Sequence, residues 1–149
     1  MNNSWFTLPT LLLAIAVVPA EATQDERRVR GEKVIETLAG TGGQPVLQQM
    51  HKDFPFLAGA ITDYALGDVW GREVLDHRTR QLATVSAFAA QGNLPQMKIH
   101  AGYALRLGVT PDELKEIIYL TTVTAGFPRA IDAAQALREV LASADASPP

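Results

Sequence analysis

The segment Gln96-Met97-Lys98-Ile99-His100 lies at the centre of residues 70–128, a stretch that carries most of the helix-start and helix-stop signals in this sequence. Gly92 ends one predicted helix, and Asn93 can cap the next, with Pro95 in its first turn. Gln96 lies three residues after Asn93, so it can complete a capping box. The segment therefore predicts a helix with a well-defined start, and it places one histidine, His100, on that helix.

A second capping box follows at Thr110-Pro111-Asp112-Glu113, directly after a helix stop at Gly108. Residues suited to burial then recur at i, i+3, i+4 and i+7, which is the spacing of one helix face: Leu114, Ile117, Ile118 and Thr121. The two boxes predict consecutive helices. Short antiparallel helix hairpins are expected around Gly92 and Gly108.

The rest of the chain has helical periodicity as well, and no segment shows the alternation of a strand over a useful length. Further helices are predicted over residues 24–38, 45–51, 54–66, 77–91 and 129–142. The sequence Gly67-Asp68-Val69-Trp70-Gly71-Arg72 is predicted to form a loop, and Asp76 to cap the helix after it. These patterns predict an all-α fold in one domain.

The composition excludes several classes of protein. The chain has 149 residues, 47% of them hydrophobic and 19% charged, which suits one globular domain with a core. Its formal net charge is -3 and its basic residues are scattered, so no nucleic-acid surface is expected. Without any cysteine, the chain cannot form disulfides, thiolate metal sites or peroxidatic thiols. The three histidines are far apart in sequence, so no metal site is expected.

The first 22 residues have the pattern of a secretory signal peptide. Residues 11–18 form an unbroken apolar run, and Pro19-Ala20-Glu21-Ala22 fits a small-x-small cleavage site. The run is too short to span a bilayer, so no membrane span is expected after leader cleavage. We expect a signal peptide over residues 1–22, a folded domain over 23–142 and a disordered tail over 143–149, in a periplasmic or secreted protein. Residues 1–4 contain no Lys or Arg, so the alternative is an apolar N-terminal helix, packed on the domain or on a partner, in a cytoplasmic protein.

Five motifs occur in the same order and with the same spacing as in a known protein family. The match extends over about residues 30–141. The motifs are Gly67-Asp68-Val69-Trp70-Gly71-Arg72, Leu75-Asp76-His77-Arg78-Thr79-Arg80-Gln81-Leu82, Gln96-x-Lys98-x-His100, Ala104-Leu105-x-x-Gly108-Val109-Thr110-x-x-Glu113-Leu114 and Ala125-Gly126-Phe127-Pro128. In combination these motifs resemble the carboxymuconolactone decarboxylase family. The resemblance implies the all-α fold of the alkylhydroperoxidase D-like (AhpD-like) group, a bundle of about six to seven helices with antiparallel hairpins. It also implies a homo-oligomer, either a trimer or a hexamer.

Three positions distinguish this chain within the group that it resembles. Relatives that reduce peroxides have a Cys-x-x-Cys pair where this chain has Asn93 and Gln96, so the thiol peroxidase branch is excluded. Those relatives also have a glutamate relay where this chain has Gln81. Decarboxylases of the family often have a tyrosine where this chain has Thr124, which is a departure from their pattern.

The resemblance implies an enzyme that removes CO₂ from a small unsaturated carboxy-lactone, such as 4-carboxymuconolactone. The conjugated lactone carbonyl can accept the electron pair of the broken bond as a dienolate, so no cofactor is required. The protein must hold an anionic substrate, stabilise the developing oxyanion and deliver a proton to carbon. Arginine suits the first two tasks through its bidentate fork. Histidine suits the third because its pKa lies near neutral pH.

Two residues are the first candidates for catalysis: His100 as the proton donor and Arg80 as the carboxylate-binding residue. The weaker candidates for substrate binding are Arg72, Trp70, Gln96 and Arg129. Each candidate has a structural alternative. A helical histidine at the edge of a core is often a structural hydrogen bonder, surface arginines are commonly solvated, a tryptophan suits a core or an interface, and Gln96 suits a helix cap.

Two other functions stay open at this stage. One is an exported, non-catalytic helical oligomer that binds a small ligand or a partner, and the other is a related lactone hydrolase or isomerase. The partner expected for the enzyme is a small anionic lactone or unsaturated acid. The observation that separates these hypotheses is whether His100 and an arginine converge on one apolar pocket.

Overall fold

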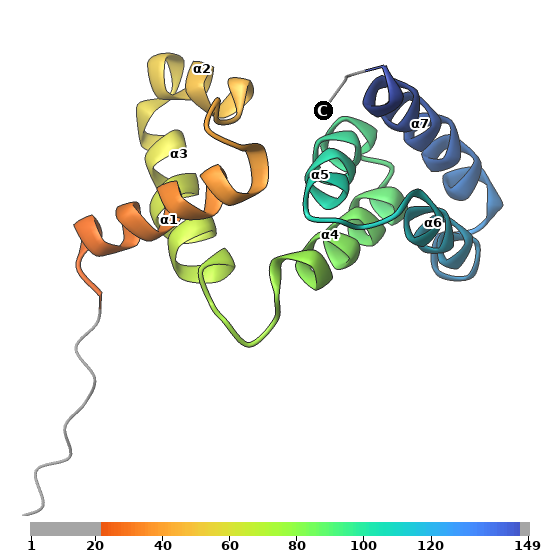
Figure 1. Cartoon of the computed structure of the whole chain (residues 1–149), viewed down its shortest axis with the longest axis horizontal. Coiled ribbons are helices and arrows are strands. Elements are labelled where there is room, and N and C mark those ends of the chain that lie inside the picture. The colour runs from red at the N-terminus through yellow and green to blue at the C-terminus, as the bar shows by residue number, and fades with distance from the viewer. Residues whose placement is uncertain (1–21, 147–149) are drawn as a thin grey trace, which may run out of the picture.

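The computed structural model describes residues 22–146, and every regular element in that range is a helix (Figure 1). The elements are α1 (Gln24–Ala39), α2 (Pro45–Asp53), α3 (Pro55–Ala60), the π-helix η1 (Ile61–Trp70), α4 (His77–Gln91), α5 (Leu94–Arg106), α6 (Pro111–Ala125) and α7 (Phe127–Asp145). The prediction of an all-α fold is confirmed. The expected signal peptide lies, apart from Ala22, outside the described residues, and so do residues 147–149. None of the described helices is both long enough and apolar enough to cross a membrane.

The predicted caps Asp76, Asn93 and Thr110 define the starts of α4, α5 and α6. The Asp76 side chain accepts a hydrogen bond of 2.7 Å from the Thr79 amide at the start of α4. Thr110 and Glu113 form the full reciprocal capping box of α6, in which the Thr110 amide donates to Glu113 over 2.9 Å. α7 extends further than predicted at both ends, because Pro128 is compatible with the first helical turn. Residues 143–145, which were expected to belong to the tail, are helical.

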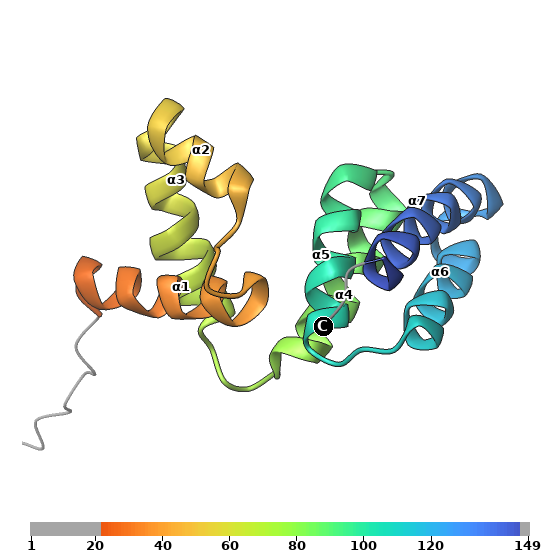
Figure 2. The same ribbon diagram turned by 45° about the horizontal axis from the view of Figure 1, so that its top comes forward.

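The N-terminal half is built on a close crossing of α1 and η1, which lie against one another in Figures 1 and 2. A Cβ built on Gly31 would lie 2.0 Å from the Thr62 carbonyl oxygen, and one on Gly67 would lie 2.2 Å from the Arg27 carbonyl oxygen. Only glycine therefore allows this separation of the two backbones. An ion pair of 3.1 Å between Arg28 and Asp63 also joins the two helices.

The prediction of a loop over residues 67–72 is wrong for residues 67–70, because the π-helix continues to Trp70. Gly67 does not mark a turn; its missing side chain allows the contact with α1. Asp68 is not a loop residue either, since its carboxylate pairs with Arg30 at 2.9 Å and with Arg27 at 3.3 Å. The irregular segment is limited to residues 71–76. A π-helix is an uncommon element that often occurs at functional sites, and this one ends at Trp70.

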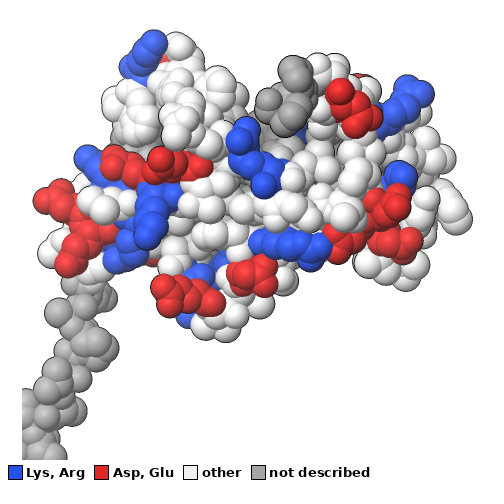
Figure 3. All heavy atoms as spheres, viewed as in Figure 1, with Lys and Arg blue, Asp and Glu red and all other residues white. Residues whose placement is uncertain are grey.

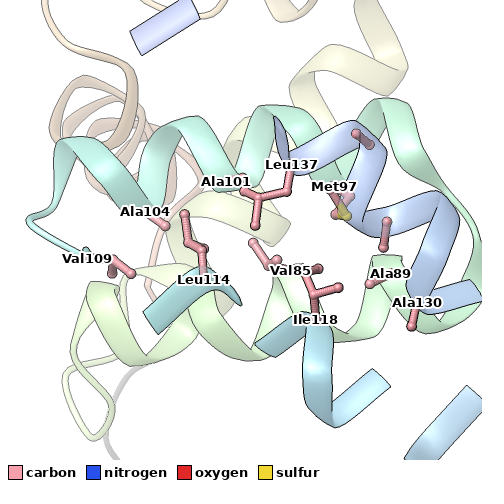
Figure 4. Close-up of a cluster of buried hydrophobic side chains, with 12 residues drawn as sticks. Val85, Ala89, Met97, Ala101, Ala104, Val109, Leu114, Ile118, Ala130 and Leu137 are labelled. Atoms are coloured by element: carbon pink, nitrogen blue, oxygen red, sulfur yellow. The ribbon is translucent and has the colours of Figure 1, made fainter. Parts of the chain in front are cut away.

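The C-terminal half is a bundle of α4, α5, α6 and α7 around an apolar core (Figure 4). Small side chains such as Ala89, Ala101 and Ala133 are fully buried and let the helices approach closely. α4 and α5 form the hairpin expected around Gly92, which has a left-handed φ of 73°. The prediction of a hairpin around Gly108 is wrong, because α6 packs on α4 and α7 and not on α5.

The two halves meet where α5 faces α1 (Figure 2). A second, smaller cluster of apolar side chains fills this contact. Its buried members are Val34, Leu38 and Leu66, and Trp70, Tyr103 and Leu107 pack against them. The seam between the halves therefore brings the end of η1 next to the helix that carries His100.

Candidate active site

His100 lines a pocket of about 170 Å³ at the seam between the two halves. Most of its wall is apolar and comes from α1, α2 and η1, including Leu38, Leu47 and Ile61. α5 supplies the opposite wall with Gln96, Ile99, His100 and Tyr103, and Trp70 contributes from the end of η1. Sites for drug-sized ligands usually have about 300–1,000 Å³, so this pocket suits a small molecule. We call it the His100 pocket.

The imidazole of His100 is held by a hydrogen bond and by aromatic rings. Its Nδ1 lies 2.8 Å from Oε1 of Gln81, a fully buried residue of α4. The ring stacks on Trp70 with 6.0 Å between centroids, and it contacts Phe88 at 5.3 Å and the edge of Tyr103 at 5.6 Å. These contacts restrict the rotation of the ring, so its position in the pocket wall is fixed.

Burial of His100 lowers its pKa from an ordinary value of 6.5 to about 4. Desolvation disfavours the imidazolium, and no carboxylate of the described residues lies at the ring to offset it. Burial also raises the pKa of Tyr103 to about 12. At neutral pH the His100 pocket therefore contains a neutral imidazole and a neutral phenol.

Gln81 decides which nitrogen of the neutral ring carries the proton. With Oε1 accepting, Nδ1 is the protonated nitrogen and Nε2 keeps its lone pair. Rotation of the amide would reverse these roles. In the observed orientation, Gln81 Nε2 is buried and has no partner among the described residues. Nε2 of His100 is then the ring nitrogen that can accept a proton.

The three arginines predicted for substrate binding lie outside the His100 pocket of the described chain. Arg80 donates to the carbonyl oxygens of Leu75 at 3.0 Å and Arg72 at 2.9 Å, so it holds the segment before α4. The Arg72 side chain is exposed and lines a different pocket. Arg129 covers the end of α4, where a Cβ on Gly92 would lie 1.9 Å from its Nη1.

Of the predicted site residues, the structure brings together Trp70, Gln96 and His100. The expected convergence of His100 with Arg80, Arg72 or Arg129 is not observed, so this criterion does not favour the enzyme over the non-catalytic ligand-binding oligomer. Thr124, the position of the family tyrosine, is exposed and donates to the Leu120 carbonyl oxygen at 3.4 Å. It does not line the His100 pocket.

Sequence reasoning missed three residues of this site. Tyr103 lies three residues after His100, so it shares a helix face with it, and this spacing could have indicated its role. Gln81 was noted only as the position of a relay glutamate. Nothing in the sequence indicated that Gln44, the N-cap of α2, would face α5 across the pocket.

The donor groups at the site give no obvious ligand set for an ion. Within residues 22–146, no group of three or more His, Asp or Glu side chains is placed to hold a metal. The His100 pocket offers one imidazole, two amides, one phenol and one indole as polar groups. These groups can orient a small acid and exchange one proton with it.

A family model and several known proteins match this chain. The model of the carboxymuconolactone decarboxylase family matches residues 55–139. A 4-carboxymuconolactone decarboxylase of Acinetobacter baylyi is 34% identical over 94 residues, which are 63% of this chain and 68% of that protein. A nitrosuccinic acid decarboxylase of Metarhizium robertsii is 30% identical over 119 residues, which are 76% of this chain and 83% of that protein. These relatives support a decarboxylase-type function.

Proposed function

Because the chain belongs to the carboxymuconolactone decarboxylase family, we propose that it is a cofactor-free carboxy-lyase acting on a small unsaturated carboxy-lactone or a chemically related acid. The observation that carries this proposal is His100, fixed by Gln81 and Trp70 in the wall of a small apolar pocket. We propose 4-carboxymuconolactone as the first substrate to test.

The names of the relatives indicate a common kind of substrate. 4-Carboxymuconolactone and nitrosuccinic acid both have a carboxyl group that can leave and an electron-withdrawing group that can accept the electron pair. The acceptor is a conjugated lactone in one and a nitro group in the other. Both also hold a second carboxyl group, which the reaction does not remove. An acid with these three features is the substrate class that we propose.

The proton balance of the reaction gives His100 its role. The bond between carbon and the leaving carboxylate breaks, CO₂ departs, and the electron pair enters the acceptor. A proton must then reach carbon, so one proton is consumed per turnover. His100 takes this proton from solvent when the anionic substrate binds, because a nearby negative charge favours the imidazolium. It then gives the proton to carbon and returns to its neutral form.

The apolar wall of the His100 pocket supports loss of CO₂. A carboxylate is strongly hydrated in water, whereas CO₂ is neutral and needs little hydration. Leu38, Leu47 and Ile61 offer no hydrogen bonds to the carboxylate, so removing it from water favours the neutral product over the ion. Trp70 and Tyr103 would lie beside the unsaturated part of the substrate.

A related isomerase or hydrolase is the second candidate, and the neutral state of His100 favours it. A neutral imidazole with a free Nε2 lone pair is a base, and a base can remove a proton from carbon or from water. The dependence of kcat/KM on pH separates the two candidates. If His100 acts as the acid, the transition state holds one proton more than the free enzyme with its neutral imidazole, so kcat/KM falls about tenfold per pH unit between about pH 5 and 8. If His100 acts as a base, kcat/KM is constant over this range.

The test is an absorbance assay of the purified protein with 4-carboxymuconolactone, together with His100→Gln. Loss of general acid catalysis should lower kcat by roughly 10²- to 10⁴-fold. His51→Gln is the matched control, because His51 is exposed on α2 and does not line the His100 pocket. Turnover by His100→Gln within threefold of the wild type would reject His100 as the acid. No turnover by the wild type would reject this substrate.

A further inference from the structure

A second pocket adjoins the His100 pocket. It has a volume of about 330 Å³, and it shares Gln44, Ile99 and Tyr103 with the His100 pocket as common walls. We call it the outer pocket. Its other side chains include two cations, Lys98 and Arg106, and no carboxylate lines it. Figure 3 shows basic side chains gathered at the seam between the N-terminal and C-terminal halves.

The two cations differ in the charge that they can offer to a ligand. Lys98 forms an ion pair with Glu139 of α7, which neutralises part of its charge. Arg106 forms no ion pair or hydrogen bond with another side chain of residues 22–146, and it is exposed. Its guanidinium lies over the end of α1, where a Cβ on Gly40 would be 3.1 Å from Nη1. The C-terminal end of a helix dipole favours a cation there, so Arg106 is positioned while its charge stays available.

The geometry of α5 connects Arg106 to His100. His100, Tyr103 and Arg106 are spaced three residues apart on α5, so they occupy neighbouring positions on one side of the helix. A rise of 1.5 Å per residue separates the first and the last by about 9 Å along the axis. An arginine side chain can cover part of this distance. A small ligand that extends from the His100 pocket into the outer pocket can therefore contact both residues.

Resting on the function proposed above, we propose that Arg106, assisted by Lys98, binds the carboxylate that the substrate keeps, while the carboxylate that leaves occupies the His100 pocket. A carboxylate paired with arginine is stabilised as an anion, and this stabilisation is lost when it becomes CO₂. A permanent cation such as arginine, which does not give its proton to carbon, would therefore slow the reaction if it were paired with the leaving group. The same cation at the retained group stabilises substrate and transition state alike, so it contributes to KM and to the orientation of the substrate.

Because the leaving and the retained carboxylate bind in different pockets, Arg106 is a specificity residue for acids with a second anionic group. Arginine binds carboxylate through two parallel hydrogen bonds, whereas lysine acts as a point charge. Because Arg106 is exposed, water and salt screen part of its effect. We therefore expect a contribution to binding of roughly tenfold, at the lower end of the range for hydrogen bonds to charged groups.

The test measures binding of two probes by calorimetry. Muconolactone keeps the retained carboxylate and lacks the carboxyl group that leaves, and its methyl ester lacks both charges. We expect the wild type to bind the acid roughly tenfold more tightly than the ester, and Arg106→Gln to bind both equally. Arg106→Lys should restore part of the preference, and added salt should weaken binding of the acid alone. Arg138→Gln is the matched control, because Arg138 is an exposed arginine on α7 that lines neither pocket.

Three results would overturn the proposal. They are an acid affinity of Arg106→Gln within twofold of the wild type, an equal loss in Arg138→Gln, or no preference of the wild type for the acid. Turnover of 4-carboxymuconolactone separates this inference from the proposed function. Turnover with an unchanged KM in Arg106→Gln would reject the subsite and leave the enzyme. Binding of the acid that depends on Arg106, without turnover, would reject the reaction and leave the subsite.

Discussion

The buried state of His100 predicts a specific loss of stability in acid. Folding lowers the pKa of this histidine from 6.5 to about 4, so below pH 6.5 the unfolded chain binds a proton that the folded chain does not. Stability must then fall as the pH decreases from about 6.5 to about 4, and this contribution is constant outside that window. The sign is opposite to that of a histidine that gains a carboxylate partner on folding.

The size of the effect follows from the two pKa values. Linkage gives a destabilisation of about 2 kcal/mol at pH 5 and about 0.2 kcal/mol at pH 7. The ring is only partly buried, and solvent reduces the desolvation that lowers its pKa. We therefore expect a difference of about 1–2 kcal/mol between the two pH values.

The assay is urea unfolding at pH 7 and pH 5 of the wild type and of His100→Gln. Glutamine does not titrate, whereas all carboxylates are common to both proteins, so their contribution cancels in the comparison. The wild type should lose about 1–2 kcal/mol more than His100→Gln on acidification, whatever the stability of the variant at pH 7. An NMR titration of the ring should give the same pKa. Equal losses in both proteins would refute the argument that His100 is held neutral by burial.

Three further predictions concern the site, the fold and the assembly. Gln81→Glu places a carboxylate at Nδ1 of His100 and should raise the pKa of the ring above its wild-type value of about 4 in an NMR titration. Gly31→Ala should destabilise the protein by at least about 2 kcal/mol in urea unfolding, because its Cβ would meet the backbone of η1 at 2.0 Å. Val123→Arg should lower the mass measured by light scattering, because Val123 is 84% exposed on an apolar face of α6 and α7 that we expect to bind a second copy.

Each of these predictions has a matched control. Gln81→Met removes the hydrogen bond without adding charge, so a similar rise in the pKa of His100 would contradict the electrostatic explanation. Gly102→Ala lies in α5 with no atom of another helix within 4 Å of the added Cβ, and it should stabilise the helix by up to about 1 kcal/mol. Val29→Arg also charges an exposed valine, but on α1, and it should leave the mass unchanged.

Local signals predicted most of the fold. Caps such as Asp76 and Thr110 act through hydrogen bonds to residues three positions away, so the sequence alone contains the whole interaction. The errors occurred where a residue acts over a long distance. Gly67 carried the signal of a turn, but it is needed where α1 crosses η1. Its partner, Arg27, is forty positions away, and no local pattern contains that information.

The site was less predictable than the fold for the same reason. His100, Gln96 and Trp70 were predicted as site residues, and all three line one pocket. Their roles in binding or catalysis stay predictions. The arginines were predicted only because a guanidinium binds carboxylate well, and this property does not determine where the end of a long side chain lies in the fold. Arg80 finds backbone carbonyl oxygens close by, in the segment that precedes its own helix. The two pockets lie at the seam between the two halves, and this seam forms only when α1 and α2 pack beside α5.

A neutral His100 suits decarboxylation better than a permanently charged one. A permanent imidazolium would pair with the leaving carboxylate and stabilise the ground state, which raises the barrier to loss of CO₂. With a pKa of about 4, the ring is charged in roughly one molecule in a thousand at pH 7, so it gains its proton mainly when an anion arrives. Once protonated in an apolar wall, it is a stronger acid than an ordinary histidine, and transfer to carbon restores the favoured neutral state. The burial that costs stability in acid therefore also drives the proton toward the product.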